Sequence, residues 1–94
     1  MKLEVYTVRD DKAEAYLQPF YLQNESLAIR AMTDCITDVN HQFAKHINDY
    51  SLYHLGTYSD SSGKFELNDS PKHVINLVDR DWETDGLHLL YNLS

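Results

Sequence analysis

The stretch that decides the fold is residues 24–39, NESLAIRAMTDCITDV, which has a strong helical period. At about 100° per residue, its apolar residues share one side of a helix: Ala28, Ile29, Ala31, Met32, Cys35, Ile36 and Val39. Asn24 is expected to cap the N-terminal end, and Asn40 to take the left-handed conformation beyond the C-terminal end. A helix of about four turns is not stable alone in water, so its apolar side must pack on a sheet.

Most of the remaining chain has the alternation or the aromatic content of β-strands. Strands are expected at residues 1–8, 16–23, 51–59 and 64–67, with a short peripheral one at 73–78. Pro19 lacks a backbone donor, so it belongs at a sheet edge, in a bulge or in extended loop. Residues 68–71 are expected to break the fourth strand. The predicted fold class is therefore α+β, a small antiparallel sheet of four to five strands with one helix packed on a face.

At 94 residues, the chain is predicted to form a single α+β domain over residues 1–78. Residues 79–94 are a different segment, acidic around Trp82 and then apolar. This C-terminal tail is expected to be an arm over a neighbouring subunit, an extra strand or a short docking helix. The exposed edges of so small a sheet also favour a homodimer.

Composition places the chain among intracellular globular proteins. No apolar run is long enough to cross a bilayer, and the alternating, acid-containing start, MKLEVYTVRDD, is unlike a signal peptide. The single cysteine, Cys35, excludes an internal disulfide and fits a reducing compartment. On the apolar side of the helix, it is expected to be a small hydrophobe rather than a reactive or ligating thiol.

The net charge of −7 argues against binding nucleic acid through charge alone. Such binding uses clustered Lys and Arg side chains, whereas the eight basic residues here are scattered singly along the sequence. The acids concentrate late in the chain, at Asp79, Asp81, Glu83 and Asp85. The surface is expected to repel phosphate unless the fold gathers a local basic patch, so a protein partner is easier to explain than DNA.

No catalytic signature is found in the sequence. Cys35, His41 and His46 lie within one stretch, but Cys-x5-His-x4-His is not a structural zinc spacing. The paired acids at residues 10–11 fit a turn, and with three glycines in the chain there is no phosphate-binding loop. We therefore expect no metal site, no cofactor and no enzymatic activity.

The aromatic residues are the one feature with the character of a binding site. Tyrosine on a sheet face can stack on the bases of a single-stranded nucleic acid. Tyrosine on a half-buried sheet is more often part of the core or of a cross-strand pair. Both interpretations stay open for the aromatic set: Tyr6, Tyr16, Phe20, Tyr21, Phe43, Tyr50, Tyr53 and Tyr58.

Several segments together resemble one protein family. They are DDKAEAYLQPF (10–20), ESLAIRAM (25–32), TDCITD (33–38), HQFAKHINDYSLYHLGTY (41–58) and SDSSGK (59–64). Their order and spacing are similar to those of the small nonstructural protein of gokushovirus-type microviruses, which are tailless phages with circular single-stranded DNA genomes. The likeness spans about residues 3–65, and the sequence after about Pro71 departs from the family pattern.

The resemblance implies a non-capsid accessory protein in the cytoplasm of the infected bacterial host. Its role would parallel that of the protein that switches isometric coliphages from duplex amplification to single-strand synthesis coupled with packaging. The implied partners are phage replication or packaging proteins or a host replication factor, with single-stranded DNA as an additional expectation and no membrane. A contrasting hypothesis is an acidic decoy or inhibitor that binds a basic host or viral protein.

Two sets of candidate contacts follow from these hypotheses. If the protein touches DNA, the groups expected at the nucleic acid are Lys12, Arg30, Lys45, Lys64, Tyr21 and Tyr53. For a protein partner, the expected contacts are His41, His46, Asp49, Tyr50 and Trp82. The first four of these lie in a polar crossing between the helix and the third strand, where His and Asp side chains could instead satisfy backbone groups of the loop.

Overall fold

The computed structural model describes residues 1–77 of the chain. In chain order, its elements are β1 (Lys2–Asp10), β2 (Ala15–Tyr16), β3 (Phe20–Leu22), α1 (Glu25–Thr37), α2 (Gln42–Lys45), the 3-10 helix η1 (Ile47–Asp49), β4 (Tyr50–Ser59) and β5 (Lys64–Asn76). The tail predicted at residues 79–94, with Trp82, lies outside the described residues.

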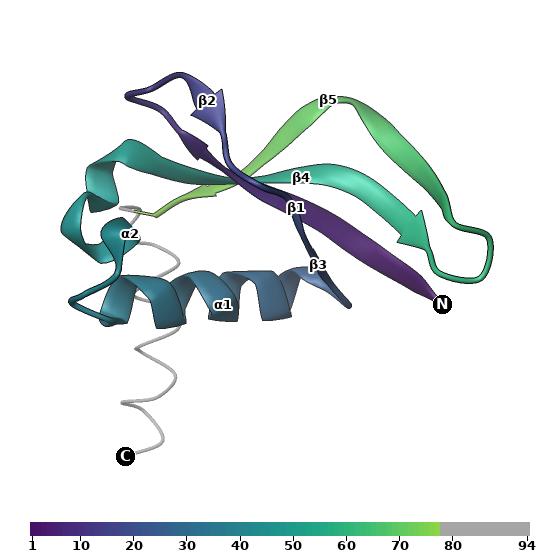
Figure 1. The fold of residues 1–94 in the computed structure, drawn as a ribbon, viewed down its shortest axis with the longest axis horizontal. Helices are drawn as coiled ribbons and strands as arrows, with labels where there is room; N and C mark the ends of the chain where they lie inside the picture. The colour runs from purple at the N-terminus through teal and green to yellow at the C-terminus, as the bar shows by residue number, and fades with distance from the viewer. Residues whose placement is uncertain (78–94) are drawn as a thin grey trace, which may run out of the picture.

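A five-stranded antiparallel sheet makes up most of the described chain. Its order is β2-β1-β4-β5, and β3 also pairs with β1. Figure 1 shows the sheet curling, with α1 and α2 on one side and with β2 and the middle of β5 rising on the other. The predicted α+β class is wrong, because strands hold 48% of the described residues and helices only 26%. The molecule is a curled, half-barrel sheet with a short helix.

β1 lies inside the sheet and has a neighbour along both edges. On one edge it pairs with β4 over its whole length, from Lys2↔Ser59 to Asp10↔Tyr50. On the other edge, β3 pairs with its first half and β2 with its last two residues. Pro19 lies in the gap between β2 and β3, where its missing donor costs no ladder hydrogen bond. Of the three places predicted for Pro19, the structure shows a loop along the edge of the sheet, between two short strands that replace the single strand predicted at residues 16–23.

β5 is one strand of 13 residues, not the two short strands predicted. It pairs with β4 at both ends, and residues 68–71 form a bulge opposite Leu55. Pro71 is tolerated there because the outer side of β5 has no partner strand in the described sheet. The end of β5 is also not peripheral, since Ile75 is buried and Leu77 is 0% exposed. The sheet therefore takes a larger share of the chain than the sequence indicated.

α1 begins where it was predicted to begin. The Asn24 side chain accepts a hydrogen bond from the Leu27 N–H at 2.9 Å, which makes Asn24 the N-cap. Ala28 and Met32 point into the core and are buried. The amphipathic pattern of the sequence therefore correctly gave the side of the helix that packs on the sheet.

The C-terminal end of α1 differs from the prediction. The helix ends at Thr37, and Asp38 is already extended. The Asp38 carboxylate accepts the Asn40 N–H at 3.0 Å, a local bond that competes with continuation of the helix. Asn40 therefore does not take the left-handed conformation, and Val39, predicted on the buried side, is 77% exposed.

The crossing from α1 to β4 is anchored by apolar side chains. Phe43 and Tyr50 are buried with their ring centroids 4.6 Å apart, and Ile47 packs against the same core. The His41 ring caps α2, because its Nδ1 accepts the Phe43 N–H at 3.1 Å. One short helix, α2, and one 3-10 turn, η1, make up this crossing.

The core lies between the helices and one face of the sheet. Tyr6 and Val8 of β1 and Leu52 of β4 meet Ala28 and Met32 of α1 there. All five are buried. No helix among residues 1–77 covers the opposite face, which is the upper side of the sheet in Figure 1.

Candidate functional site

The face of the sheet that points away from α1 carries a row of aromatic rings. Alternation along β1 sends Tyr6 and Val8 toward the helix, so its odd-numbered residues from Leu3 to Arg9 face the other way. The cross-strand register places ring-bearing residues of the other strands on this same side. We call this surface the aromatic face: Tyr16, Tyr21, Tyr53, Tyr58, Phe65 and His73.

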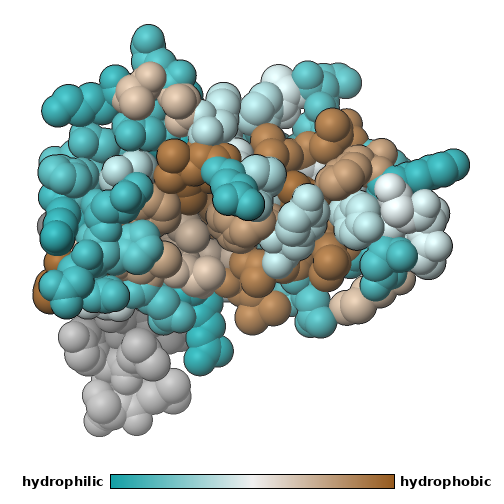
Figure 2. All heavy atoms as spheres, viewed as in Figure 1, coloured by the Kyte–Doolittle hydropathy of each residue, from teal (hydrophilic) through white to brown (hydrophobic). Residues whose placement is uncertain are grey.

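One group of rings, the hairpin cluster, lies toward the β4–β5 hairpin and consists of Tyr21, Tyr58 and Phe65. The ring centroids are 4.8 Å apart for Tyr58 and Phe65, 5.7 Å for Tyr21 and Tyr58, and 6.3 Å for Tyr21 and Phe65. Beside it, Leu67 is 67% exposed. Figure 2 shows apolar side chains over this part of the molecule, interrupted by polar ones. A contiguous exposed apolar cluster of this kind marks an interaction site more often than a lone tyrosine does.

The second group, the His73 cluster, consists of Tyr16, Tyr53 and His73. Tyr53 packs edge-on against Tyr16 at 5.5 Å and against His73 at 5.3 Å. The Arg9 guanidinium lies 5.8 Å from the centre of the Tyr16 ring, within cation–π distance. Three strands, β2, β4 and β5, thus each contribute one ring to this cluster.

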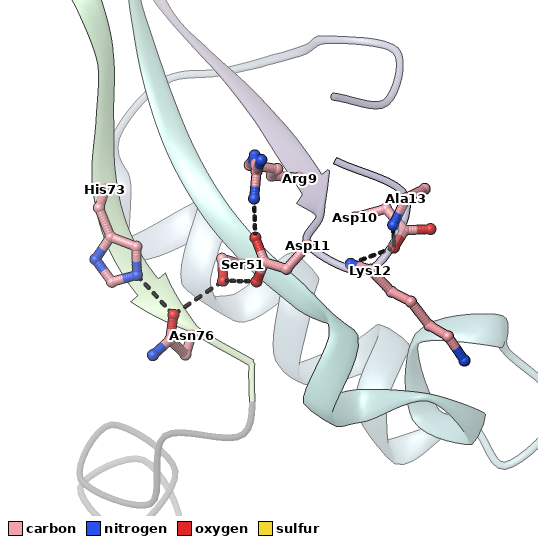
Figure 3. A network of polar contacts seen from close by, with 8 residues as sticks. All are labelled: Arg9, Asp10, Asp11, Lys12, Ala13, Ser51, His73 and Asn76. Atoms are coloured by element: carbon pink, nitrogen blue, oxygen red, sulfur yellow. Dashed lines mark hydrogen bonds and ion pairs between the residues drawn. The ribbon is translucent and has the colours of Figure 1, made fainter. Parts of the chain in front are cut away.

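A polar network fixes Arg9 and His73 at this end of the face (Figure 3). Arg9 donates to Asp11 Oδ1 at 2.8 Å, and the Ser51 hydroxyl donates to Asp11 Oδ2 at 2.8 Å. Asn76 Oδ1 lies 2.9 Å from the Ser51 hydroxyl and 2.8 Å from His73 Nε2. Burial alone would raise the pKa of Asp11, but the hydrogen bonds from Ser51 and Arg9 outweigh it and lower that pKa. The network joins β1, β4 and β5 and so orders the side chains around the rings.

The aromatic face can make stacking and apolar contacts with little contribution from charge. Tyr16, Tyr21 and Phe65 are 48%, 41% and 49% exposed. Stacking of a base on an aromatic side chain is worth about 1–3 kcal/mol, so a few rings give measurable binding without a basic patch. The Arg9 charge next to Tyr16 is offset by Asp11. The surface therefore favours flat, apolar or aromatic ligands over simple anions.

The structure brings together only part of the nucleic-acid set predicted from the sequence. Tyr21 and Tyr53 both lie on the aromatic face, one in each cluster. The four predicted cations are exposed but occupy separate places, namely the turn after β1 (Lys12), α1 (Arg30), the end of α2 (Lys45) and the start of β5 (Lys64). These four residues do not gather into one basic patch.

The residues predicted to contact a protein partner lie in the crossing that packs under the sheet. His41 caps α2, and Tyr50 is 7% exposed, with its pKa raised by burial and by nearby acids. His46 ends α2, and the Asp49 carbonyl accepts a backbone hydrogen bond from the turn after β1 at 2.7 Å. These contacts hold the crossing together. A role in binding a partner stays a prediction for all four, and Trp82 lies outside the described residues.

Sequence reasoning missed Arg9, Phe65 and His73 as members of this surface. Period-two alternation after the turn at Gly63 was a usable signal for Phe65 and Leu67, which share one side of β5. No such signal was available for His73. Its position beside the rings depends on the bulge in β5, which resets the register with β4.

Among residues 1–77, no group of three or more His, Cys, Asp or Glu side chains could hold a metal ion. Cys35 is half-buried in α1, and burial together with Asp34 and Asp38 raises the pKa of its thiol. A raised pKa lowers the thiolate fraction and with it the reactivity. Within the same described range, no helix is both long enough and apolar enough to cross a membrane.

The fold and the face define a small sheet protein with helices on one side and an exposed aromatic surface on the other. The chain belongs to the family of phage ORF5 proteins, whose family model matches residues 3–80. The prediction of a phage protein is thereby confirmed at the level of that family. No curated protein and no solved structure matches the chain.

Proposed function

We propose that this phage protein is a non-enzymatic accessory factor that binds single-stranded DNA on its aromatic face. The observation that carries the proposal is the pair of exposed ring clusters on the sheet face that no described helix covers. Single-stranded nucleic acids are commonly bound by sheet surfaces on which successive bases stack against aromatic side chains. Such stacking tolerates any sequence, because every base has a flat face.

The biological setting of the proposal comes from the resemblance. In this setting, the chain is the nonstructural protein of a gokushovirus-type microvirus and acts in the cytoplasm of the infected bacterium. A phage with a single-stranded genome must handle new single strands while they are made and packaged. A protein that holds the strand weakly and also contacts a replication or packaging protein would assist that step without catalysing a reaction. A homodimer would offer two aromatic faces to one strand.

The acidity of the chain sets the expected character of the binding. A net charge of −7 repels phosphate at long range, so stacking must supply most of the affinity. Each phosphate contacted on a single strand contributes about −0.7 to the slope of log affinity against log salt. With few cations near the rings, the slope is expected to be shallow and the affinity modest.

The proposal is tested by titrating a fluorescently labelled oligonucleotide, single-stranded or duplex, with the protein at low salt. Tyr21→Ala removes one exposed ring and is expected to weaken single-strand binding by about 5- to 150-fold, the equivalent of the stacking energy of one base. The matched control Tyr21→Phe keeps the ring and should bind nearly as well as the unchanged protein. Arg30→Ala, on α1, should have little effect. Equal binding of the duplex, or an unchanged affinity in Tyr21→Ala, would refute the proposal.

A second candidate function, an acidic decoy for a basic host or viral protein, is favoured by the same net charge of −7. In that case, the aromatic face would pack against apolar side chains of the basic partner. The unchanged protein should then capture the phage replication initiator and should not bind single-stranded DNA. Changing Asp79, Asp81, Glu83 and Asp85 to amides should abolish that capture. If the amide variant still captures the initiator, the decoy function is refuted.

A further inference from the structure

A polar cleft of about 370 Å³ opens on the helix side of the sheet, between the start of α1 and β5. The residues that line it include Glu4, Tyr6, Glu25, His54, Lys72 and His73. Small-molecule sites have volumes of roughly 300–1,000 Å³, so the cleft has room for a single nucleotide.

The Tyr6 hydroxyl is a buried polar group in the lining of this cleft that has no hydrogen-bond partner among residues 1–77. Tyr6 is 1% exposed, yet its hydroxyl makes no hydrogen bond with any of residues 1–77. Among residues 1–77, every fully buried polar side-chain atom has a hydrogen-bond partner. The unpartnered Tyr6 hydroxyl is therefore not fully buried, and the space that it reaches is the cleft that Tyr6 lines. Burial, followed by the charges of Glu25 and Glu4, raises the pKa of Tyr6 to about 12. The hydroxyl therefore stays a hydrogen-bond donor at neutral pH.

The Glu4 carboxylate, which lines the same cleft, is held in place by His54. The Asn68 amide nitrogen donates to the His54 carbonyl at 3.0 Å and lies 3.0 Å from His54 Nδ1. An amide nitrogen does not accept hydrogen bonds, so Nδ1 is the acceptor and the imidazole proton is on Nε2. Nε2 then donates to Glu4 Oε1 at 3.0 Å. One carboxylate oxygen is engaged in this bond, and the group keeps further capacity to accept from a ligand.

We propose that this cleft binds one unpaired nucleobase through its Watson–Crick edge. All four bases present on that edge a hydrogen-bond donor next to an acceptor. The Tyr6 hydroxyl supplies the matching donor, and the Glu4 carboxylate supplies the matching acceptor. In a duplex the same edge is occupied by the paired base, so the cleft recognises only a base that has left the stack. Lys72, an exposed residue of the lining, is available to the phosphate of the bound nucleotide.

His73 connects the cleft with the aromatic face. It is among the residues that line the cleft, and its ring packs edge-on against Tyr53 at 5.3 Å. A strand stacked on the His73 cluster can therefore pass over β5 and turn one nucleotide into the cleft. This path rests on the proposed function, but recognition of the base itself can be measured with a mononucleotide.

The test compares thymidine 5′-monophosphate with its N3-methyl derivative, in which the donor of the Watson–Crick edge is blocked. Binding is followed by NMR chemical-shift titration of the full chain. Thymidylate is expected to shift resonances of Tyr6 and His54, and the methylated nucleotide to bind at least about fivefold more weakly. Tyr6→Phe keeps the ring, removes the hydroxyl and should weaken thymidylate binding about 3- to 10-fold. The control Ser62→Ala removes an exposed hydroxyl from the turn between β4 and β5, outside both the cleft and the aromatic face, and should leave that affinity unchanged.

Equal binding of the two nucleotides, an unchanged affinity in Tyr6→Phe, or no shift at millimolar thymidylate would overturn the inference. The comparison of the two nucleotides on the unchanged protein decides the matter even if Tyr6→Phe does not fold. If oligonucleotide binding depends on Tyr21 but no mononucleotide binds, base binding in the cleft is refuted and the proposed function of the aromatic face is supported. If thymidylate binding depends on Tyr6 but oligonucleotide binding does not change in Tyr21→Ala, base binding in the cleft is supported and stacking on the aromatic face is refuted.

Discussion

Replacing Gly56 with alanine is expected to force β4 and β5 apart at the edge of the bulge. A Cβ atom on Gly56 would lie 2.2 Å from the Glu66 carbonyl oxygen and 2.7 Å from Leu67 Cα. Both atoms belong to the backbone of the neighbouring strand, so no flexible side chain can move out of the way. The Gly56 φ of +150° is also a conformation that residues with a side chain rarely adopt.

The size of the effect follows from these two costs. Strain in a sparsely populated backbone conformation costs about 1–3 kcal/mol, and overpacking a closely packed site costs about 1–3 kcal/mol more. Together they lower the free energy of unfolding by about 2–6 kcal/mol. A domain of this length has a total stability of about 5–14 kcal/mol, so the variant loses a large share of it.

Urea unfolding followed by far-UV circular dichroism measures this loss. Gly63→Ala is the matched control, because Gly63 has a φ of +72° but a Cβ there would meet nothing within 4 Å. Its cost is limited to the backbone conformation, about 1–2 kcal/mol. Gly56→Ala should therefore be the less stable of the two by about 1–3 kcal/mol. Stabilities within about 0.5 kcal/mol of each other would refute the close approach of the two strands.

Two substitutions and one chemical modification test other contacts. Asn24→Ala removes the cap on the Leu27 N–H and should lower the free energy of unfolding in urea by about 1 kcal/mol; no loss would mean that the cap is not formed. The lowered pKa of Asp11 contributes stability above its unfolded value of about 3.9, and this is lost as pH falls through the folded value. In Asp11→Asn, the midpoint of thermal unfolding should fall less steeply as the pH drops below about 4. The same pH dependence as in the unchanged protein would contradict the hydrogen-bond network around Asp11. Cys35, whose pKa is raised by burial, should react with iodoacetamide more slowly in the folded than in the urea-unfolded chain; equal rates would contradict its burial.

The start of α1 could be predicted because its signals are local. A capping side chain at Asn24 and an apolar stripe leading to Ala28 and Met32 are both set by neighbours within a few residues. Its end could not be predicted, because the Asp38 side chain forms a local hydrogen bond that competes with continuation of the helix. The Asp38 carboxylate accepts the Asn40 N–H, and the helix ends at Thr37, two residues before the predicted end at Val39.

The continuity of β5 could not be predicted from the sequence. Asn68 and Pro71 are strand breakers on average, and they interrupt a strand when both of its edges are paired. Here the residues lie in a bulge on an outer strand, where the missing donor is harmless. That position is a property of the assembled sheet, so the sequence indicated two short strands and an α+β balance that the structure corrects.

The aromatic face was only partly predictable for a related reason. Alternation shows which residues share a side of a strand, and in β1 it separates Tyr6 from Val5. It does not show which side the helix will cover, and both residues are buried in the structure. Tyr21 and Tyr53 were therefore identified as candidate contacts, whereas the surface that joins them became visible only with the cross-strand register.

The most direct test of the central claim is the affinity for a labelled single-stranded oligonucleotide measured across a range of salt concentrations, with the duplex as comparison. Binding through rings with one or two phosphate contacts predicts a preference for the single strand and a log–log slope of about −0.7 to −1.4. Light scattering on the same sample gives the subunit count of the binding species. No binding at low salt, or binding of the duplex with equal affinity, would contradict the account and assign the aromatic face to a protein partner.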